Sequence, residues 1–333
     1  MSMSSGRCSL NFHHHFFFPQ GCRQDCCEDE RRNDPSDEPP VGIRSGPTPT
    51  FAPTSGAERL CNGISRQQRA NVIRMRLSLI SQVSDLVDLQ SPQGKAYHWI
   101  LAEDDAQLCP LDANLEQRYA LAVVYFATDG KDWTSCSKGD RDCPVFPFLS
   151  AESECSWYGV DCNFNNDVDT LDLGDNNLNG EIPPEIRALK WLDVLVLESN
   201  RLKGTIPNGF NEGLVRLRLN NNLLEGEVPA PLPTSLFALY LNNNRLSGTL
   251  DGVIDNLPDM RQLQLQNNLF EGTIPASLSD MNNLRNANFE GNNLSGNMPS
   301  KVCDLKEVRS GLTLLAVDCD EVRCLCCDPA CAS

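Results

Sequence analysis

Leucine and other apolar residues recur with a fixed period along residues 168–308. Six units follow one template, L-x-x-L-x-L-x-x-N-x-L-x-G-x-I-P, at intervals of 22 or 24 residues. Apolar residues two positions apart share one face of a β-strand. One such coil cannot bury its apolar face alone, so consecutive coils must stack and align their strands in a parallel sheet. The pattern therefore predicts an α/β solenoid whose units begin at Val168, Leu192, Leu214, Leu236, Met260 and Leu284.

The ninth position of the template is always Asn. An Asn amide both donates and accepts hydrogen bonds, so it can satisfy backbone groups in its own bend and in the next coil. Losing such a partner in the interior would cost about 1–3 kcal/mol. The thirteenth position is always Gly, which permits a backbone conformation that a Cβ atom would oppose. We expect a structural ladder made of Asn176, Asn200, Asn222, Asn244, Asn268 and Asn292.

The pattern before the repeats is different. Residues 1–63 combine an acidic stretch at 25–40 with Pro, Thr and Ser at 47–55, a composition that predicts a disordered tail. Apolar spacings of three and four residues then predict helices over about 65–87, 94–103 and 112–128, with an interruption at Ser91-Pro92. We therefore divide the chain into a tail (1–63), a helical amino-terminal cap (64–167), repeats (168–308) and a Cys-rich carboxy-terminal cap (309–333).

These motifs resemble a known family. The repeats, with their G-x-I-P segment, are similar to the plant-type leucine-rich repeat, and Cys155-Ser-Trp157-Tyr-Gly-Val-Asp-Cys162 resembles the Cys-x-Trp-x-Gly-Val-x-Cys cap of that class. The helix at 118–133 and the Cys-rich tail are similar to those of diatom and related stramenopile leucine-rich repeat proteins. The resemblance covers about 65–333. It implies a right-handed horseshoe solenoid with a parallel concave sheet, and protein recognition, often extracellular.

The 16 cysteines lie in three groups, with none between Cys162 and Cys303. Cysteines at both ends of a Cys-free array suggest end caps closed by disulfides, and hence an oxidising compartment. We expect a Cys155–Cys162 bridge and a bridge from Cys303 to the tail, whose cysteines are Cys319, Cys324, Cys326, Cys327 and Cys331. Zinc binding by this tail in an intracellular protein is the alternative, although adjacent cysteines fit the usual C-x2–4-C pairs poorly.

Charge narrows the range of partners. The chain has 28 Lys and Arg against 45 Asp and Glu, a net charge of −17, which argues against nucleic acid and against anionic lipid. The longest strongly apolar run, 119–127, is far shorter than the ~20 residues of a membrane-spanning helix. Residues 1–20 lack the apolar core and cleavage site of a signal peptide. We expect an extracellular or cell-surface protein whose amino terminus is incomplete or carries another export signal.

Candidate chemistry is sparse. The sequence lacks G-x-S-x-G, H-E-x-x-H and phosphate-loop motifs. We expect His98 on the cap surface or in the cap core, the triplet at 13–15 in a low-complexity tail, and the acids at 103–105 and 140–142 in solvent. Oxygen ligands alternate at 161–167, but the sixth-position Gly and closing Glu of a calcium loop are missing. We therefore predict no enzyme, no metal site and no cofactor.

The third, fifth and seventh template positions should face outward on the concave sheet. This places apolar, cationic and aromatic side chains beside a ladder of amides, in a patch made of Val194, Val196, Arg216, Arg218, Tyr240, Gln262, Gln264 and Gln266. Arg and Tyr are enriched where binding energy concentrates. We predict a protein ligand with an acidic or amide-rich loop, and a polysaccharide stacked on Tyr240 is the alternative.

The resulting hypothesis is a non-enzymatic recognition module with a receptor-like or adhesion role. An inhibitor of a secreted hydrolase, similar to the plant polygalacturonase-inhibiting proteins, and a structural wall component are the alternatives. Asn293-Leu294-Ser295 is the one N-glycan acceptor sequence. Because Asn293 follows ladder residue Asn292, we expect its side chain to be exposed.

Overall fold

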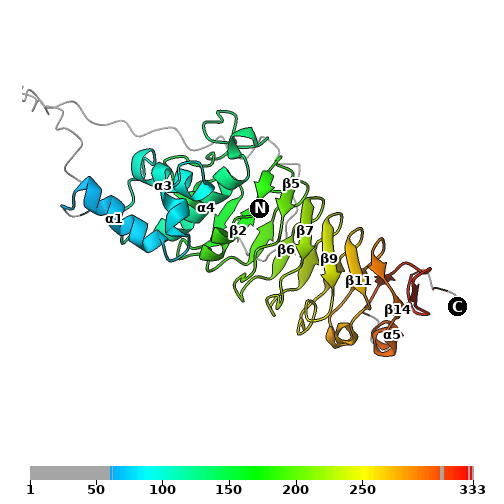
Figure 1. Cartoon of the computed structure of the whole chain (residues 1–333). Helices are drawn as coiled ribbons and strands as arrows, with labels where there is room; N and C mark the ends of the chain where they lie inside the picture. The colour runs from blue at the N-terminus through cyan, green and yellow to red at the C-terminus, as the bar shows by residue number, and fades with distance from the viewer. Residues whose placement is uncertain (1–60, 62, 308–310, 329–330, 332–333) are drawn as a thin grey trace, which may run out of the picture. The chain divides into compact units, whose positions relative to one another are not determined.

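The computed structural model describes residues 61, 63–307, 311–328 and 331. The helical cap precedes a long run of short strands (Figure 1). The predicted tail lies outside the described residues except for Cys61 and Gly63, and so does the His triplet at 13–15.

The concave sheet has eight strands. Their order is β1-β2-β4-β6-β8-β10-β12-β15, in which β1 is antiparallel to β2 and all other neighbours are parallel. The fourth template residues are aligned across the sheet and are buried, which confirms the predicted solenoid. The strands are β1 (Val160–Cys162), β2 (Val168–Asp172), β4 (Val194–Val196), β6 (Arg216–Arg218), β8 (Ala238–Tyr240), β10 (Gln262–Gln264), β12 (Asn286–Asn288) and β15 (Leu314–Ala316).

The parallel part of this sheet is one coil longer than the six repeats. Strand β15 lies in the carboxy-terminal cap and continues the register of β12. Its sequence keeps the L-x-x-L-x-V spacing of Leu312, Leu315 and Val317, but it begins 28 residues after Leu284 and lacks the Asn. Asp318 takes over part of the Asn role, because its Oδ2 accepts hydrogen bonds from the N–H groups of Gly291 and Asn292.

A second series of short strands follows the Asn ladder, although the sequence indicated only extended segments there. The six strands pair in parallel in the order β13-β11-β9-β7-β5-β3. The Gly at the thirteenth position has positive φ in all six repeats, between 73° and 138°, as expected from its lack of Cβ. The strands are β3 (Asn179–Glu181), β5 (Arg201–Gly204), β7 (Leu223–Glu227), β9 (Arg245–Thr249), β11 (Leu269–Gly272) and β13 (Asn293–Leu294).

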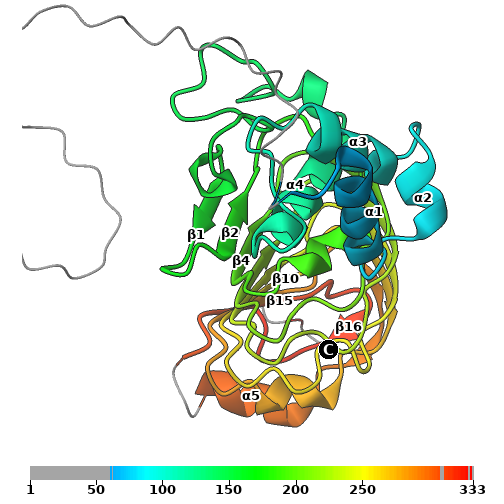
Figure 2. The same cartoon turned by 90° about the vertical axis from the view of Figure 1, so that its left-hand side faces the viewer.

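Short helices complete the coils. In Figure 2 the strands β2, β4, β10 and β15 follow one another on one side, and α5 lies on another. The elements are the 3-10 helices η3 (Pro184–Ala188) and η4 (Ala276–Asp280), helix α5 (Ser300–Glu307), and the paired strands β14 (Gly296–Asn297) and β16 (Val322–Arg323).

The amino-terminal cap contains four α-helices. The single helix predicted at 65–87 is instead two, because the chain turns between α1 (Arg66–Leu77) and α2 (Val83–Val87). Pro92 does not break structure but begins α3 (Pro92–Ala102), where its missing N–H costs nothing and Ser91 caps the helix. Helix α4 (Leu115–Ala127) is buried along most of its length and packs on α3 and on η3. Two 3-10 turns, η1 (Gly130–Asp132) and η2 (Glu154–Ser156), follow.

The cap and the repeats share one continuous hydrophobic core. Gly180 lies at a close approach in this junction, since a Cβ atom there would stand 2.0 Å from the carbonyl oxygen of Ala127. The end of α4 therefore approaches β3 closely enough that a larger residue would force the two apart.

Candidate binding surface

Two rows of side chains cross the concave sheet. The parallel register places Val194, Arg216, Ala238 and Gln262 side by side in the first row. The second row lies two residues further along each strand and contains Val196, Arg218, Tyr240 and Gln264. The predicted patch is thus brought together by strands β4, β6, β8 and β10.

Arg218 is the best-positioned cation of this surface. Its Nε lies 3.3 Å from Oε2 of Glu198, and its guanidinium carbon lies 4.8 Å from the centre of the Tyr240 ring. The Arg218 side chain is about one third exposed. Glu198 is at the seventh template position and was not included in the predicted patch. Its ion pair with Arg218 joins two adjacent coils, which the sequence pattern did not indicate.

Val196 was predicted to face solvent, and this prediction is wrong. It is only 5% exposed, and Ala238 in the first row is also buried. Short side chains in a parallel row are covered by longer neighbours less than 5 Å away on either side. The exposed part of the patch therefore comes from Val194, the arginines, Tyr240 and the Gln side chains, all of which are half-buried.

Two acceptors on this face have no hydrogen-bond partner among the described residues. They are Oδ1 of Asn220, whose residue is 9% exposed, and Oε1 of Gln266. Gln262 differs, since its Oε1 accepts a hydrogen bond of 3.0 Å from Asn286. Buried polar atoms are normally paired, so these two acceptors are suited to donors from water or a ligand.

The Asn ladder has the predicted structural role. In Asn222, Nδ2 donates to the carbonyl oxygens of Leu197 and Leu219, and Oδ1 accepts from the N–H of Leu202. Asn244, Asn268 and Asn292 repeat this arrangement. Asn176 has no equivalent earlier coil, and its amide instead binds the backbone of Ser135 in the cap.

In the acidic triplet at 103–105, Glu103 and Asp105 are exposed as predicted, but the prediction is wrong for Asp104. Asp104 is buried and forms a two-point ion pair with Arg118, at 2.7 and 2.8 Å. Arg118 also contacts Glu154 at 3.2 Å and lies over the rings of Trp99 and Trp157. These residues are far apart in sequence, so no local pattern indicated the cluster.

The remaining candidate residues have structural surroundings. His98 is exposed on α3, 3.5 Å from Glu103. Residues 163–167 turn between β1 and β2, and Oδ1 of Asn163 accepts from the N–H groups of Asn165 and Asp167. The exposed side chain expected of Asn293 is confirmed on β13. Within the described part of the chain, no His, Cys, Asp and Glu side chains are grouped in threes that could hold a metal ion.

The cysteines of both caps form disulfides. The predicted Cys155–Cys162 bridge is confirmed, and Cys303 reaches the tail through Cys326. The other tail bridges are Cys319–Cys331 and Cys324–Cys327, so the structure adopts the disulfide interpretation of the tail. The amino-terminal cap contains two more, Cys61–Cys109 and Cys136–Cys143.

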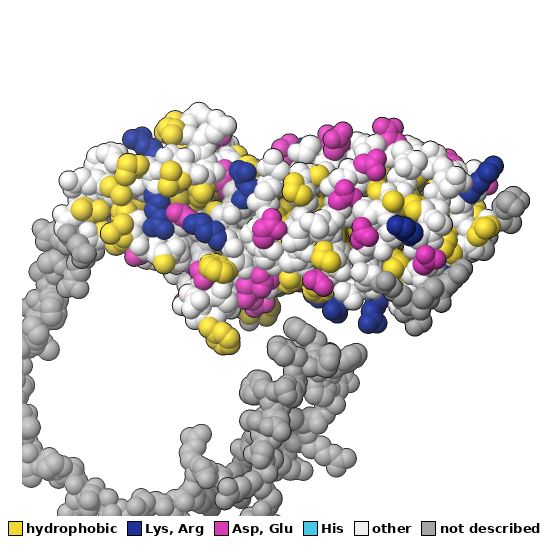
Figure 3. All heavy atoms as spheres, turned by 90° about the horizontal axis from the view of Figure 1, so that it is seen from below, with side chains coloured by type: hydrophobic (Ala, Val, Ile, Leu, Met, Phe, Trp, Pro, Cys, Tyr) yellow, Lys and Arg dark blue, Asp and Glu magenta, His cyan; other side chains and the backbone are white. Residues whose placement is uncertain are grey.

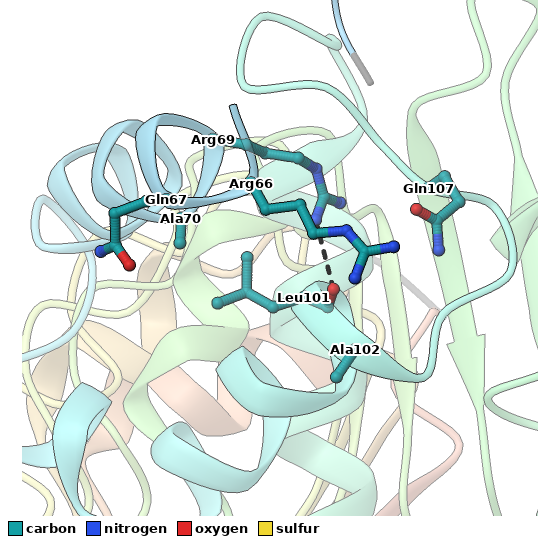
Figure 4. A pocket seen from close by; sticks show the side chains of 7 residues that line it. All are labelled: Arg66, Gln67, Arg69, Ala70, Leu101, Ala102 and Gln107. Atoms are coloured by element: carbon teal, nitrogen blue, oxygen red, sulfur yellow. Dashed lines mark hydrogen bonds between the residues drawn. The ribbon is translucent and has the colours of Figure 1, made fainter. Parts of the chain in front are cut away.

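A hollow of about 420 Å³ lies in the cap between α1 and the end of α3. Figure 4 shows Arg66, Arg69 and Gln107 around its opening. The Arg69 guanidinium donates to the carbonyl oxygens of Ile100, Leu101 and Leu108. Through the first two it supplies hydrogen-bond donors to the last turn of α3. None of the seven lining side chains is a carboxylate or a nucleophile, so the hollow offers no acid–base or nucleophilic chemistry.

Apolar side chains also gather on the outer surface of the cap. Figure 3 shows them with Lys and Arg at the cap end of one face, whereas acidic side chains are scattered over the repeats. They come from α1, α2 and the adjoining loops, and the exposed members are Val72, Met75, Leu79, Val83, Val87 and Leu89. No helix among residues 61–331 as described is both long and apolar enough to cross a bilayer.

Comparisons with known proteins agree with the repeat geometry. The family described as Leucine Rich Repeat matches residues 167–189. Protein MALE DISCOVERER 1 of Arabidopsis thaliana is 45% identical over 56 residues, which is 17% of this chain and 8% of that protein. Leucine-rich repeat protein 1 of the same plant is 44% identical over 43 residues, 13% of this chain and 20% of that protein. The matches therefore span a small part of these curated relatives.

Solved structures give longer alignments. The BIR3–SERK2 complex from Arabidopsis thaliana aligns at 32% identity over 52% of this chain and 95% of the other, with a TM-score of 0.41. The LRR ectodomain of the receptor kinase SOBIR1 aligns at 28% identity over 54% of this chain and 95% of the other, with a TM-score of 0.45.

The stacked coils, the parallel concave sheet and the disulfide-closed ends define a capped solenoid of the α/β class. This is the fold of a leucine-rich repeat solenoid, and its repeats are similar to those of the plant leucine-rich repeat proteins.

Proposed function

We propose that this protein is a non-enzymatic recognition module that binds a protein or peptide ligand on its concave sheet. The observation that carries the proposal is the Arg218 side chain, which is partly exposed and held between Glu198 and Tyr240. A side chain already held in its binding conformation loses little entropy when a ligand arrives. The sheet beneath it is tied by backbone and Asn hydrogen bonds, so the whole surface is preorganised.

The chemistry of the surface suggests the class of ligand. Arg218 and Arg216 can bind a carboxylate, and Arg forms strong charge-assisted hydrogen bonds with such groups. The acceptors of Asn220 and Gln266 are buried without partners, so a small rotation of either side chain would let it accept from a backbone or amide N–H group of a ligand. An extended peptide segment with an acidic residue offers both. A polysaccharide suits the patch less well, because Arg218 already covers one face of the Tyr240 ring.

The proposed location is the cell exterior or cell surface. Six disulfides close the two caps, and disulfides persist in oxidising compartments. Thiol counting on the denatured protein, with and without reductant, tests this point. Twelve thiols that appear only after reduction support export, whereas the same thiols free before reduction would contradict it.

A displayed library of random peptides tests the binding proposal. We expect the peptides enriched on the full chain to carry an acidic residue and to bind at least tenfold more weakly to Arg218→Glu. The matched control is Lys203→Glu, which changes the net charge equally at an exposed strand position away from the concave sheet. Equal binding to all three proteins, or no enrichment, would refute the proposal.

The same variant separates the alternatives. Capture of a secreted hydrolase by the wild-type chain, lost in Arg218→Glu, would identify an inhibitor that uses this surface. Retention in a cell-wall fraction that is insensitive to Arg218→Glu would instead favour a structural wall component. We also propose, from the cysteines of its caps, that this protein is related to the diatom leucine-rich repeat proteins.

A further inference from the structure

Along the side of the concave sheet where its strands begin, here called the edge, acidic residues are followed by apolar and then by basic residues. The residues at the second template position lie where each strand begins, and the backbone joins them directly. From the second repeat to the sixth, each donates its N–H to the carbonyl oxygen of the corresponding residue in the coil before it, at 2.7–2.9 Å. In order along the solenoid, this edge row is Asp169, Asp193, Val215, Phe237, Arg261 and Arg285.

The two ends of the edge row have opposite charge. Among the described residues, no cation lies within ion-pair distance of Asp169 or Asp193, and no carboxylate lies within that distance of Arg261 or Arg285. Partial burial and the neighbouring Asp169 raise the pKa of Asp193. Within the described part of the chain, neither pair is therefore neutralised by an ion pair.

The middle of the row is apolar and aromatic. Val215 and Phe237 are half-buried, and Phe237 lies between Arg216 and Arg261, whose guanidinium carbons stand 5.4 and 5.9 Å from its ring centre. Trp191, two residues before Asp193, is 60% exposed. Aromatic side chains of this kind are typical of protein interfaces.

We propose that two copies of this chain associate through the edge row, antiparallel, about a twofold axis between Val215 and Phe237. Reversing the row places Asp169 against Arg285, Asp193 against Arg261, and Val215 against Phe237. Each acidic residue of one copy then faces a basic residue of the other, and the twofold axis makes each such pair occur twice. This self-complementarity is what a twofold interface requires, because residue i must fit residue j and j must fit i.

A second copy is the occupant that matches the row best. Successive residues are about 4.8 Å apart, so the row spans about 24 Å. Another copy carries the opposite charges at the same spacing, because the same sheet sets it. The interface is small, so we expect a weak association. The net charge of −17 opposes pairing, but at ~0.15 M salt the Debye length of about 8 Å screens it more than it screens contacting pairs.

Sedimentation equilibrium of the full chain provides the test. We expect a concentration-dependent doubling of mass at ~0.15 M salt that is lost at ~1 M salt. Arg261→Glu with Arg285→Glu should abolish it, whereas the control Lys203→Glu with Arg245→Glu, which changes the net charge equally, should retain it. A wild-type chain that stays monomeric at high protein concentration, or a dimer that survives the edge substitutions, would overturn the proposal.

A mixing experiment makes the test specific. Asp169→Arg with Asp193→Arg gives a row with two basic ends, and Arg261→Glu with Arg285→Glu gives a row with two acidic ends. Each variant should be monomeric alone, and an equal mixture should form a heterodimer. Failure to pair, with both variants folded by circular dichroism, would contradict the twofold arrangement and point to a different bipolar partner.

The concave ligand site is tested separately. Arg218→Glu should keep the dimer, because Arg218 is outside the edge row. A dimer lost in Leu79→Ser but retained in the edge variants would place the contact on the apolar cap surface and refute the edge interface.

Discussion

The repeats and the amino-terminal cap are stabilised in different ways. In the repeats, each coil makes the same contacts as the next, such as the hydrogen bonds of Asn222 to two adjacent coils. In the cap, one cluster around Arg118 joins helices and loops that have no internal repetition. Stabilising contacts are therefore distributed along the solenoid but concentrated around one cluster in the cap.

The disulfides follow the same division. Coils inside the array are covered on both sides by neighbours, whereas each end lacks one neighbour. Each of the six bridges among the described residues has at least one cysteine in a cap, and none links two coils inside the array. The amino-terminal end is further sealed by packed aromatic rings of Trp99, Tyr125, Trp133, Phe148 and Trp157.

Replacing the centre of the cap cluster should have the largest effect. Arg118→Met would leave Asp104 and Glu154 buried without a cation, at a cost of about 3–5 kcal/mol. Urea unfolding followed by Trp fluorescence measures it, because Trp99, Trp133 and Trp157 are buried in the cap. The exposed Arg74→Met in α1 is the control. A loss below ~1 kcal/mol would show that the cluster does not hold the cap.

Removing one rung of the ladder should cost less. Asn222→Ala deletes the donors to two coils and leaves their carbonyl oxygens unpaired, a loss of about 1–3 kcal/mol. Asn242→Ala, at a half-buried seventh position in the next coil, should change little. Equal effects of the two substitutions, measured by urea unfolding, would contradict the structural role of the ninth position.

The junction between the regions should give a smaller, pH-dependent effect. Burial acts to raise the pKa of Glu116, but hydrogen bonds from Lys190 and Arg76 outweigh it and lower the pKa below 4.5. A lowered folded pKa contributes stability above the unfolded value, and this is lost as pH falls through the folded pKa.

We therefore expect Glu116→Gln to be less stable than wild type at pH 7 and nearly equal to it in acid. Thermal unfolding across this pH range tests the expectation, with the exposed Glu225→Gln as control. A difference that grows as the pH falls would have the wrong sign.

The exposed cap surface should give the smallest effect. Leu79 is 80% exposed, so Leu79→Ser should alter the free energy of unfolding by no more than about 0.5 kcal/mol. Leu77→Ala, two residues earlier but fully buried, should cost about 2–5 kcal/mol. A large loss from Leu79→Ser would mean that the cap surface is covered in the native protein.

The candidate site was only partly predictable. The register of the patch followed from the repeat, since equivalent positions in a parallel sheet must be neighbours. The burial of Val196 and the contact between Arg218 and Glu198 did not follow, because both depend on side-chain lengths in adjacent coils. Asp104 was misassigned for a similar reason, since its partner Arg118 lies on another element.

Sequence pattern alone was enough to predict the solenoid, the burial of the L-x-L residues, the Asn ladder and the disulfide-bonded ends. These features repeat or are local, so a short stretch of chain carries all the information needed. The contacts between residues that are not equivalent in the repeat emerge only in the folded chain: the Arg118 cluster, the ion pair of Arg218 with Glu198 and the added strand β15. Such contacts join residues that share no local pattern, and their geometry exists only after the coils have stacked.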